Sequence, residues 1–406
     1  MKLIIALLMI LYLYALTFGI FLTDLFRIPA PLIFCFPLIF LFRNKQETPF
    51  LYMKEVAFIS LAIFLYYFVG LSEFKTFARN MLSVMVCALF FNYFIGNNRR
   101  RFNSAIIIFY SLLAFSAILM VIDSFYGIET FRGLLLDEKV MQSPAGIAIY
   151  QFNFGYQLAA LTPFIFIYAC TLNKSFILTV MALFICLVFL LLGMQRSAFV
   201  TFLFATTVFL LVYYRFKAVF FISISVVLCG LIYYFVLNDY IDGIENIITK
   251  NETSDPSHNR GSLTEENLNI YLEHPYGLIF YGKTWSDAIY RNYIFSDGIT
   301  SHNAYLMFIT YLGPFLGLGL LISIYHKICR IFLNIIQVIR NPENRLLVCL
   351  CFSFLSVSIN ALFHNAWLIE ANGPTVFLFF SILHMYKFKM VDLIAPDQSL
   401  KTLSYA

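Results

Sequence analysis

Residues 175–214 read SFILTVMALFICLVFLLLGMQRSAFVTFLFATTVFLLVYY, two apolar runs separated only by the turn Gly193-Met194-Gln195-Arg196. Each run has about 20 residues, the length that an α-helix needs to cross the hydrocarbon core of a bilayer. Arg196 is the only charged residue in the stretch. The pattern predicts two membrane-spanning helices joined by a very short turn.

The rest of the chain has the same character. Its 406 residues are 61% hydrophobic and 12% charged, and the mean hydropathy is +0.83. Soluble proteins carry roughly 25% charged residues. The composition therefore excludes a soluble globular protein, a disordered chain and a disulfide-rich secreted domain. The eight cysteines lie in or next to apolar runs, so we expect small packing residues rather than disulfides or metal ligands.

Apolar runs recur along the chain and predict an all-α, polytopic helical membrane protein with about 12 transmembrane helices. The predicted spans are roughly 3–22, 28–42, 55–71, 77–95, 103–122, 149–171, 175–193, 196–214, 218–237, 303–326, 346–364 and 373–388. The first run lacks a signal-peptidase cleavage pattern, so it is expected to remain as an anchor.

The distribution of charge predicts the orientation. If both termini are cytoplasmic, most of the 27 Lys and Arg residues fall on the cytoplasmic side and most of the 22 Asp and Glu residues fall outside, as the positive-inside rule requires. We expect one transmembrane domain over 1–406, with an extracytoplasmic loop at 123–148. A larger extracytoplasmic loop, 238–302, lies between spans 9 and 10 and is expected to contain short helices, and 390–406 form a cytoplasmic tail.

Acidic residues are missing from the predicted spans, except for Glu55 at the edge of one. Ion-coupled transporters usually place acids near the middle of the bilayer, so the pattern argues against a transporter. The chemistry is expected at the outer ends of the helices and in the large loop.

Two arginines on the predicted outer side are candidate anion ligands. Arg196 lies in a turn with no acid to pair it, and it either binds an anionic ligand or extends toward lipid headgroups. Arg260 comes just before Ser262-Leu263-Thr264-Glu265, which has the pattern of a helix capping box. Cations beside a helix N-terminus can form an anion site, and the alternative is a solvated loop arginine.

His302 is a candidate general base. Ser301 is predicted to cap the tenth span, which would place His302 in the first helical turn. The helix dipole and the nearby lipid would then disfavour the imidazolium form, and a neutral imidazole can accept a proton. The alternative is an interfacial histidine with a structural hydrogen bond. The outer loops contain no carboxylate pair or His/Cys cluster with metal spacing, so no metal site is expected.

Together these stretches resemble the O-antigen ligase and O-antigen polymerase superfamily of bacterial membrane glycosyltransferases. The matching residues are Gly193-Met194-Gln195-Arg196-Ser197-Ala198, then Arg260 followed by Glu273-His274-Pro275, and His302-Asn303-Ala304-Tyr305-Leu306 with Gly313 and Gly317 behind it. The resemblance covers about the second half of the chain.

The resemblance implies a GT-C-like fold in the bacterial inner membrane and a glycan donor linked to undecaprenyl diphosphate. It implies that Arg196 and Arg260 bind the diphosphate and that His302 activates the acceptor hydroxyl, with Asn303, Tyr305 and Arg291 in supporting positions. It implies no cofactor and no nucleic acid. The expected partners are the lipid-linked donor and acceptor oligosaccharides and the bilayer, and a chain-length regulator protein is compatible with it.

Members of this superfamily differ in the acceptor. A polymerase joins lipid-linked O-antigen repeat units, whereas a ligase transfers the finished glycan to the lipid A core. We favour the polymerase because the outer loops have few basic residues to meet an anionic lipid A core. A lipid-linked oligosaccharide flippase is a more remote alternative, since the spans lack a polar path. A structural scaffold would leave Arg196, Arg260 and His302 unexplained.

Overall fold

The computed structural model describes residues 2–19, 30–43, 49–126, 146–147, 151–172, 175–232, 234, 260–289 and 302–402. These parts of the chain are helical and contain no β-strand. The elements are α1 (Lys2–Phe18), α2 (Ala30–Leu41), α3 (Met53–Ile63), η1 (Phe64–Gly70), α4 (Phe74–Leu89), η2 (Phe90–Ile95), α5 (Arg99–Tyr126), α7 (Gln151–Leu172), α8 (Phe176–Leu192), α9 (Arg196–Tyr214), η3 (Arg215–Lys217), α10 (Ala218–Ile232), α12 (Arg260–Glu273), η6 (Leu278–Tyr281), α13 (Trp285–Ile289), α14 (Ala304–Gln337), η8 (Pro342–Asn344), α15 (Arg345–Asn360) and α16 (Gly373–Thr402).

Helices cover most of every predicted apolar run, which confirms an all-α, polytopic membrane protein. Within the described ranges, seven helices are long and apolar enough to cross a membrane. They are Met53–Gly70, Phe74–Ile95, Arg99–Phe125, Asn153–Leu172, Arg196–Phe220, Ala304–Gln337 and Pro342–Asn360. Shorter apolar helices lie at Lys2–Phe18, Leu32–Leu41 and Phe176–Leu192.

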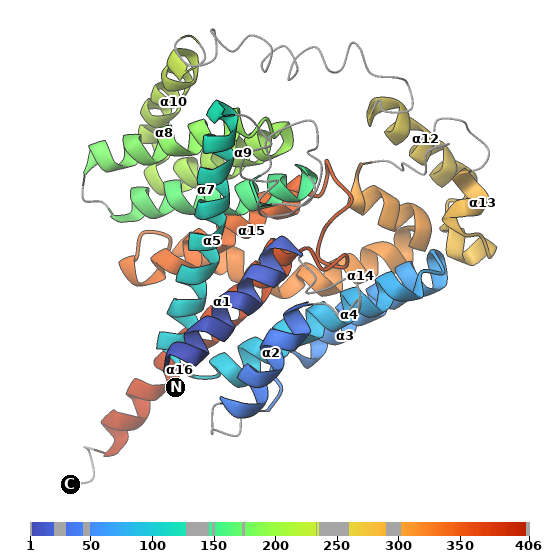
Figure 1. Ribbon diagram of the computed structural model, residues 1–406, viewed down its shortest axis with the longest axis horizontal. Coiled ribbons are helices and arrows are strands. Elements are labelled where there is room, and N and C mark those ends of the chain that lie inside the picture. The colour runs from blue at the N-terminus through green and yellow to red at the C-terminus, as the bar shows by residue number, and fades with distance from the viewer. Residues whose placement is uncertain are drawn as a thin grey trace.

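Helix α15 lies in the interior of the bundle, where it contacts α7, α9 and α16 (Figure 1). Most of its residues are buried, as expected for a helix that is apolar around its whole circumference. Small polar residues serve as contacts between helices here, since the Ser356 hydroxyl donates a hydrogen bond to Thr201 Oγ1 on α9 at 3.1 Å. Such contacts satisfy hydroxyls that have no access to water.

Helix α14 is kinked at Gly313, whose φ of 79° lies in the left-handed region, and Pro314 follows it. The kink is where the large loop docks. A Cβ atom at Gly313 would lie 1.8 Å from the Tyr276 carbonyl oxygen, and one at Gly277 would lie 2.2 Å from the Gly313 nitrogen. Only glycine allows this backbone contact. Thr310 reinforces it, because its hydroxyl donates to Asn267 Oδ1 of α12 at 2.6 Å.

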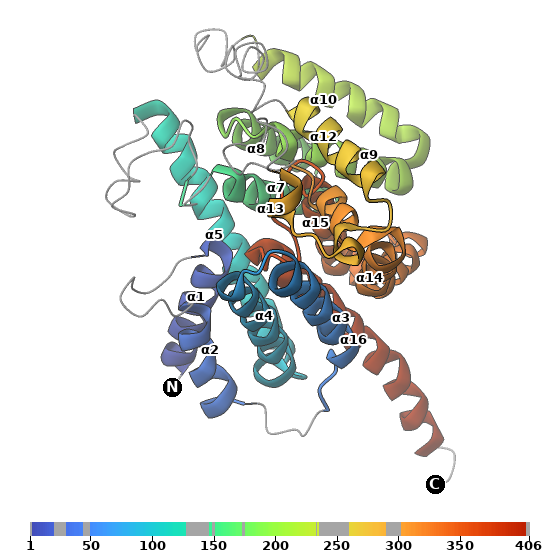
Figure 2. The same cartoon turned by 90° about the vertical axis from the view of Figure 1, so that its right-hand side faces the viewer.

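The bundle has two ends. We call one the His302 end, defined by the start of α14, the turn 193–196 and the loop 361–372 between α15 and α16. The other is the Lys327 end, defined by the ion pair between Lys327 and Glu55. In Figure 2, α12 and α13 lie in front of α15 and above α14, and α12 contacts α14. The described part of the large loop therefore covers the bundle beside the start of α14.

Candidate active site at the His302 end

Asn303 caps helix α14. Its side-chain oxygen accepts a hydrogen bond from the Leu306 N–H at 3.0 Å, and its backbone is extended. The expectation that Ser301 is the cap, with His302 in the first turn, is therefore wrong. Asn and Ser are both good caps, and Asn303 takes the role, so His302 lies just before the helix with its side chain half-buried.

The loop 361–372 connects the first and third motifs of the sequence. The Ala304 N–H, at the start of α14, donates to the carbonyls of Ala361 and His364 at 3.0 and 3.1 Å. The His364 ring shares a hydrogen bond of 2.8 Å with Ser197, next to Arg196 at the start of α9. One loop thus holds the starts of α9 and α14, which carry Arg196 and His302.

Other helices fix this loop from further sides. The Tyr156 hydroxyl of α7 donates to the Ala366 carbonyl. At the far end of the loop, a Cβ atom on Gly373 would lie 1.9 Å from the Leu16 carbonyl oxygen, so α16 begins in backbone contact with α1. These contacts come from α7 and α1, in the first half of the chain, and leave the loop little freedom.

Arg196 is the first residue of α9 and is half-buried. The turn before it is tight, because a Cβ atom on Gly193 would lie 2.7 Å from the Phe189 carbonyl oxygen and 2.9 Å from the Leu158 side chain. Met194 has a positive φ of 49°, an uncommon conformation for a residue other than glycine. The short turn predicted from the sequence therefore exists, and packing against α7 and α8 fixes the place of Arg196.

The second motif is only partly described. Helix α12 begins at Arg260 itself, so the prediction that Ser262 caps this helix is wrong and Ser262 lies in its first turn. The helix ends at Glu273 as expected before Pro275, with Leu263 and Ile270 buried. The side chain of Arg260 and the whole of Arg291 lie outside the described residues.

Tyr305, like the cap residue Asn303, has a structural role at the start of α14. The Tyr305 hydroxyl donates to the Ser358 carbonyl of α15 at 3.0 Å and lies 3.1 Å from the Tyr325 hydroxyl. Its ring contacts Trp367 edge-on, with 5.0 Å between the ring centroids. Tyr305 therefore holds α14 against α15 and the loop 361–372, and its support of the site is indirect.

A cavity of about 250 Å³ opens beside the start of α14. Ala304 and Met307 of α14 line it, together with residues from two distant segments. These are Tyr66, Tyr67, Leu71, Glu73, Thr76 and Arg79 around the turn between η1 and α4, and Asn365, Trp367 and Glu370 from the loop 361–372. The cavity thus combines aromatic rings, two carboxyl groups and one guanidinium group at the His302 end.

Glu370 is the least solvated charged group of this cavity. Its Oε2 atom is inaccessible to solvent and has no hydrogen-bond partner among the described residues, although part of the residue remains exposed. Burial raises the pKa of the Glu370 carboxyl to about 7, Arg79 opposes the rise and Glu73 adds to it. Near neutral pH this carboxyl can therefore donate a hydrogen bond as an acid or accept one as a carboxylate.

Glu73, Arg79 and Glu370 were not predicted as site residues from the sequence. They lie in or beside short connections between helices and not in the two long loops. One signal was present, because Glu370 follows Trp367-Leu368-Ile369, an apolar run too short to span a membrane. An acid at the end of such a run in an outer turn indicates a partly buried charge.

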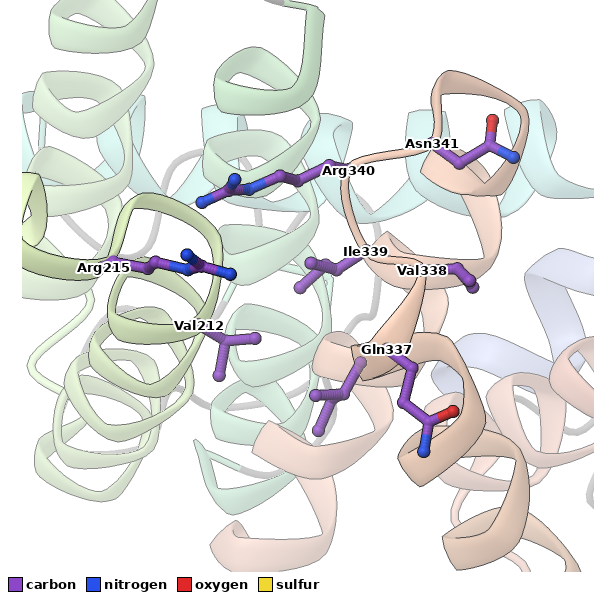
Figure 3. Close-up of a pocket in the computed structure, with 8 residues that line it drawn as sticks. Val212, Arg215, Gln337, Val338, Ile339, Arg340 and Asn341 are labelled. Atoms are coloured by element: carbon purple, nitrogen blue, oxygen red, sulfur yellow. The ribbon is translucent and has the colours of Figure 1, made fainter.

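A second cavity, of about 390 Å³, lies at the Lys327 end between η3 and the turn after α14. Arg215 and Arg340 extend into it from opposite sides (Figure 3). The Arg340 guanidinium donates twice to the Tyr213 carbonyl, at 2.8 and 3.1 Å. Among the described residues, the lining of this cavity contains no acid and no candidate base, so these residues do not provide the groups that glycosyl transfer needs.

Comparison with known proteins agrees with the sequence motifs. Residues 181–322 match the model of a protein family described as O-antigen ligase. The matched range contains Arg196, Arg260, His302 and the kink residue Gly313. None of the curated proteins matches the chain. The match covers most of α8, α9, the large loop and the first part of α14, and it supports a relationship of this part of the chain to the O-antigen ligase and polymerase superfamily.

Proposed function

We propose that the chain transfers a glycan from undecaprenyl diphosphate to a sugar hydroxyl at the His302 end, which faces the periplasm. One observation carries the proposal: His364 contacts Ser197, next to Arg196, and Ala304, two residues after His302. A cation for the leaving group and a base for the acceptor thus come from helix starts that share one anchored loop.

The reaction requires three groups. The acceptor oxygen attacks the anomeric carbon of the donor, and the bond from that carbon to the diphosphate oxygen breaks with its electron pair leaving on the diphosphate. Arg196 and Arg260 neutralise this charge, because guanidinium groups bind phosphate oxygens with two parallel hydrogen bonds. The His302 imidazole accepts the proton of the acceptor hydroxyl. Arg291 is proposed as a further cation from the large loop.

The lipid environment fits this arrangement. The undecaprenyl tail of the donor stays in the bilayer beside the apolar helices, while the polar glycan lies above the ends of α9 and α14. We propose that the product is polymerised O-antigen in the inner membrane, because the outer loops have few basic residues to meet an anionic lipid A core. Transfer to the lipid A core is the alternative acceptor reaction.

Deletion of the gene tests the proposal when it is followed by gel analysis of the lipopolysaccharide. A polymerase leaves bands with a single repeat unit, and a ligase leaves a bare core with lipid-linked polymer accumulating. A normal ladder contradicts both. Transfer by the purified protein should persist in excess chelator, and activity that magnesium or manganese must restore would mean that the arginines do not neutralise the diphosphate alone.

The orientation has its own test. Reporter fusions after Lys217, at the Lys327 end, should be cytoplasmic, and fusions near Lys250 should be periplasmic. The expected result follows from the excess of Lys and Arg in the loops of that end. The opposite result at either position would place the His302 end in the cytoplasm, where a periplasmic transferase cannot act.

A further inference from the structure

The Oε2 atom of Glu370 is a buried polar atom without a hydrogen-bond partner among the described residues, and it belongs to a residue that lines the cavity beside the start of α14. Buried polar side chains are nearly always hydrogen-bonded, and each exception requires an explanation. Isolation from water makes ionisation of an acid costly, so folding alone does not favour an acid in this place. A ligand in the cavity that donates or accepts hydrogen bonds would supply the missing partner.

The lining of the cavity indicates the chemical class of that ligand. Tyr66, Tyr67 and Trp367 provide aromatic surface, which can pack against the C–H face of a sugar ring. Glu370 and Glu73 accept hydrogen bonds from hydroxyl or amino groups, and Arg79 donates them. With two acids and one cation, the lining is ill-suited to a diphosphate and well suited to a neutral or amino sugar.

The position of the cavity relates it to the proposed reaction. Ala304 and Met307, which line it, lie on the first turn of α14 and directly follow His302 and Asn303. The cations proposed for the donor come from α9 and the large loop instead. A sugar in the cavity would therefore lie beside the start of α14, close in the chain to His302.

We infer that this cavity binds the terminal sugar of the acceptor glycan, and that Glu370 is the residue that holds it through a hydroxyl or amino group. The inference rests on the proposed function, and it assigns donor and acceptor to different parts of the His302 end. The donor diphosphate belongs to the α9 and α12 starts, and the acceptor belongs to the η1–α4 turn and the loop 361–372.

The kinetic test uses Glu370→Gln, which keeps the shape of the side chain and removes its charge. We expect the KM for the acceptor to rise about tenfold, with the donor KM unchanged and kcat within about threefold. Glu343→Gln is the matched control, because Glu343 is exposed at the Lys327 end, and it should leave both KM values unchanged. An unchanged acceptor KM overturns the inference, and so does a large loss of kcat alone, which would make Glu370 the base.

A binding test separates this inference from the proposed function. The probe is the repeat-unit oligosaccharide released by mild acid from the lipid carrier of the host and labelled by reduction with tritiated borohydride. Wild-type protein and His302→Ala should bind it equally, and Glu370→Gln at least tenfold more weakly. Equal binding by Glu370→Gln, or no saturable binding by the wild type, overturns the acceptor site. Normal transfer by His302→Ala would overturn only the proposed base.

Discussion

The two ends of the molecule use their charged residues differently. At the Lys327 end, three cationic side chains have partners within the protein. Lys327 pairs with Glu55 at 2.6 Å, and Arg340 binds the Tyr213 carbonyl. The Arg101 guanidinium donates to the carbonyls of Phe42 and Phe94 at 2.8 and 2.7 Å. The last carbonyls of a helix have no partner in their own helix, so these arginines complete the helix ends.

At the His302 end, Glu370 lines a cavity, and its Oε2 atom has no hydrogen-bond partner in the described part of the chain. The contrast offers a way to separate structural from functional charges in a membrane protein that has few of either. A charge that completes a helix end has a structural role, whereas a carboxyl oxygen that lines a cavity and has no such partner is available to a ligand. The following experiments test whether the contrast is real.

The largest difference in glycan transfer is expected between variants of two histidines, one just before α14 and one within it. His302→Ala should reduce glycan transfer by about 100- to 10,000-fold, the usual effect of losing a positioned base, with normal abundance in the membrane. His326→Ala, exposed next to Lys327, should leave transfer unchanged. Membrane abundance and polymer length measured together decide the matter, and equal losses in both variants would mean that the histidines are structural.

The next largest difference in glycan transfer is expected between Arg→Lys variants at the two ends. Arg196→Lys and Arg260→Lys keep the charge but lose the planar fork, so each should lower transfer about 10- to 100-fold, as expected for one strong charged hydrogen bond. Arg340→Lys makes the same change at the Lys327 end and should leave transfer unaffected. Rates with purified proteins check this, and full activity of Arg196→Lys would show that its charge alone suffices.

The Lys327 end should respond in stability instead of activity. Lys327→Met leaves the Glu55 carboxyl, which is 7% exposed, without its cation. Since Lys327 is itself about half exposed, the loss should be about 1 kcal/mol, which lowers the thermal unfolding midpoint in detergent by a few degrees. Glycan transfer per folded molecule should remain normal. A specific loss of transfer would contradict the division between structural charges at the Lys327 end and functional charges at the His302 end.

Removal of the Glu370 carboxyl should have the opposite effect from Lys327→Met and should increase the stability of the folded protein. Its carboxyl ionises near 4.5 when unfolded and near 7 when folded, so the folded state loses stability as the pH rises through this range. Arg79 and Glu73 are the charged groups that face it. Glu370→Gln should raise the unfolding midpoint at pH 8 by a few degrees and at pH 5 by less. An equal gain at both pH values would mean that ionisation of Glu370 is not the cause.

The sequence was sufficient for the helices and for most of the motif positions. Apolar runs of spanning length leave few alternatives, and the turn at Arg196 and the glycine at 313 have the places that their residue types indicate. The first residue of each helix was harder to predict than the helix itself. Ser301 and Asn303 are both competent caps, and in the structure Asn303 caps α14, where the first helical N–H is bonded to the loop 361–372.

The cavity could not be predicted from local patterns. Glu370 is separated from Glu73 and Arg79 by nearly 300 residues of chain, and only the packing of α4, α14 and α15 brings them together. No periodicity or spacing rule relates such positions. The same is true of His364, whose link between Ser197 and Ala304 depends on the course of the loop 361–372.

The lining of the cavity has a consequence for the classification of such enzymes. The family match covers residues 181–322, which include the proposed donor residues, but of the cavity lining only Ala304 and Met307. If the proposed assignment holds, a motif search built on that range groups chains by how they bind the lipid diphosphate and carries little information on the acceptor of the glycan. Sorting relatives by acceptor sugar would require alignment of residues 66–79 and 361–372, two short stretches that lie wholly outside the signature.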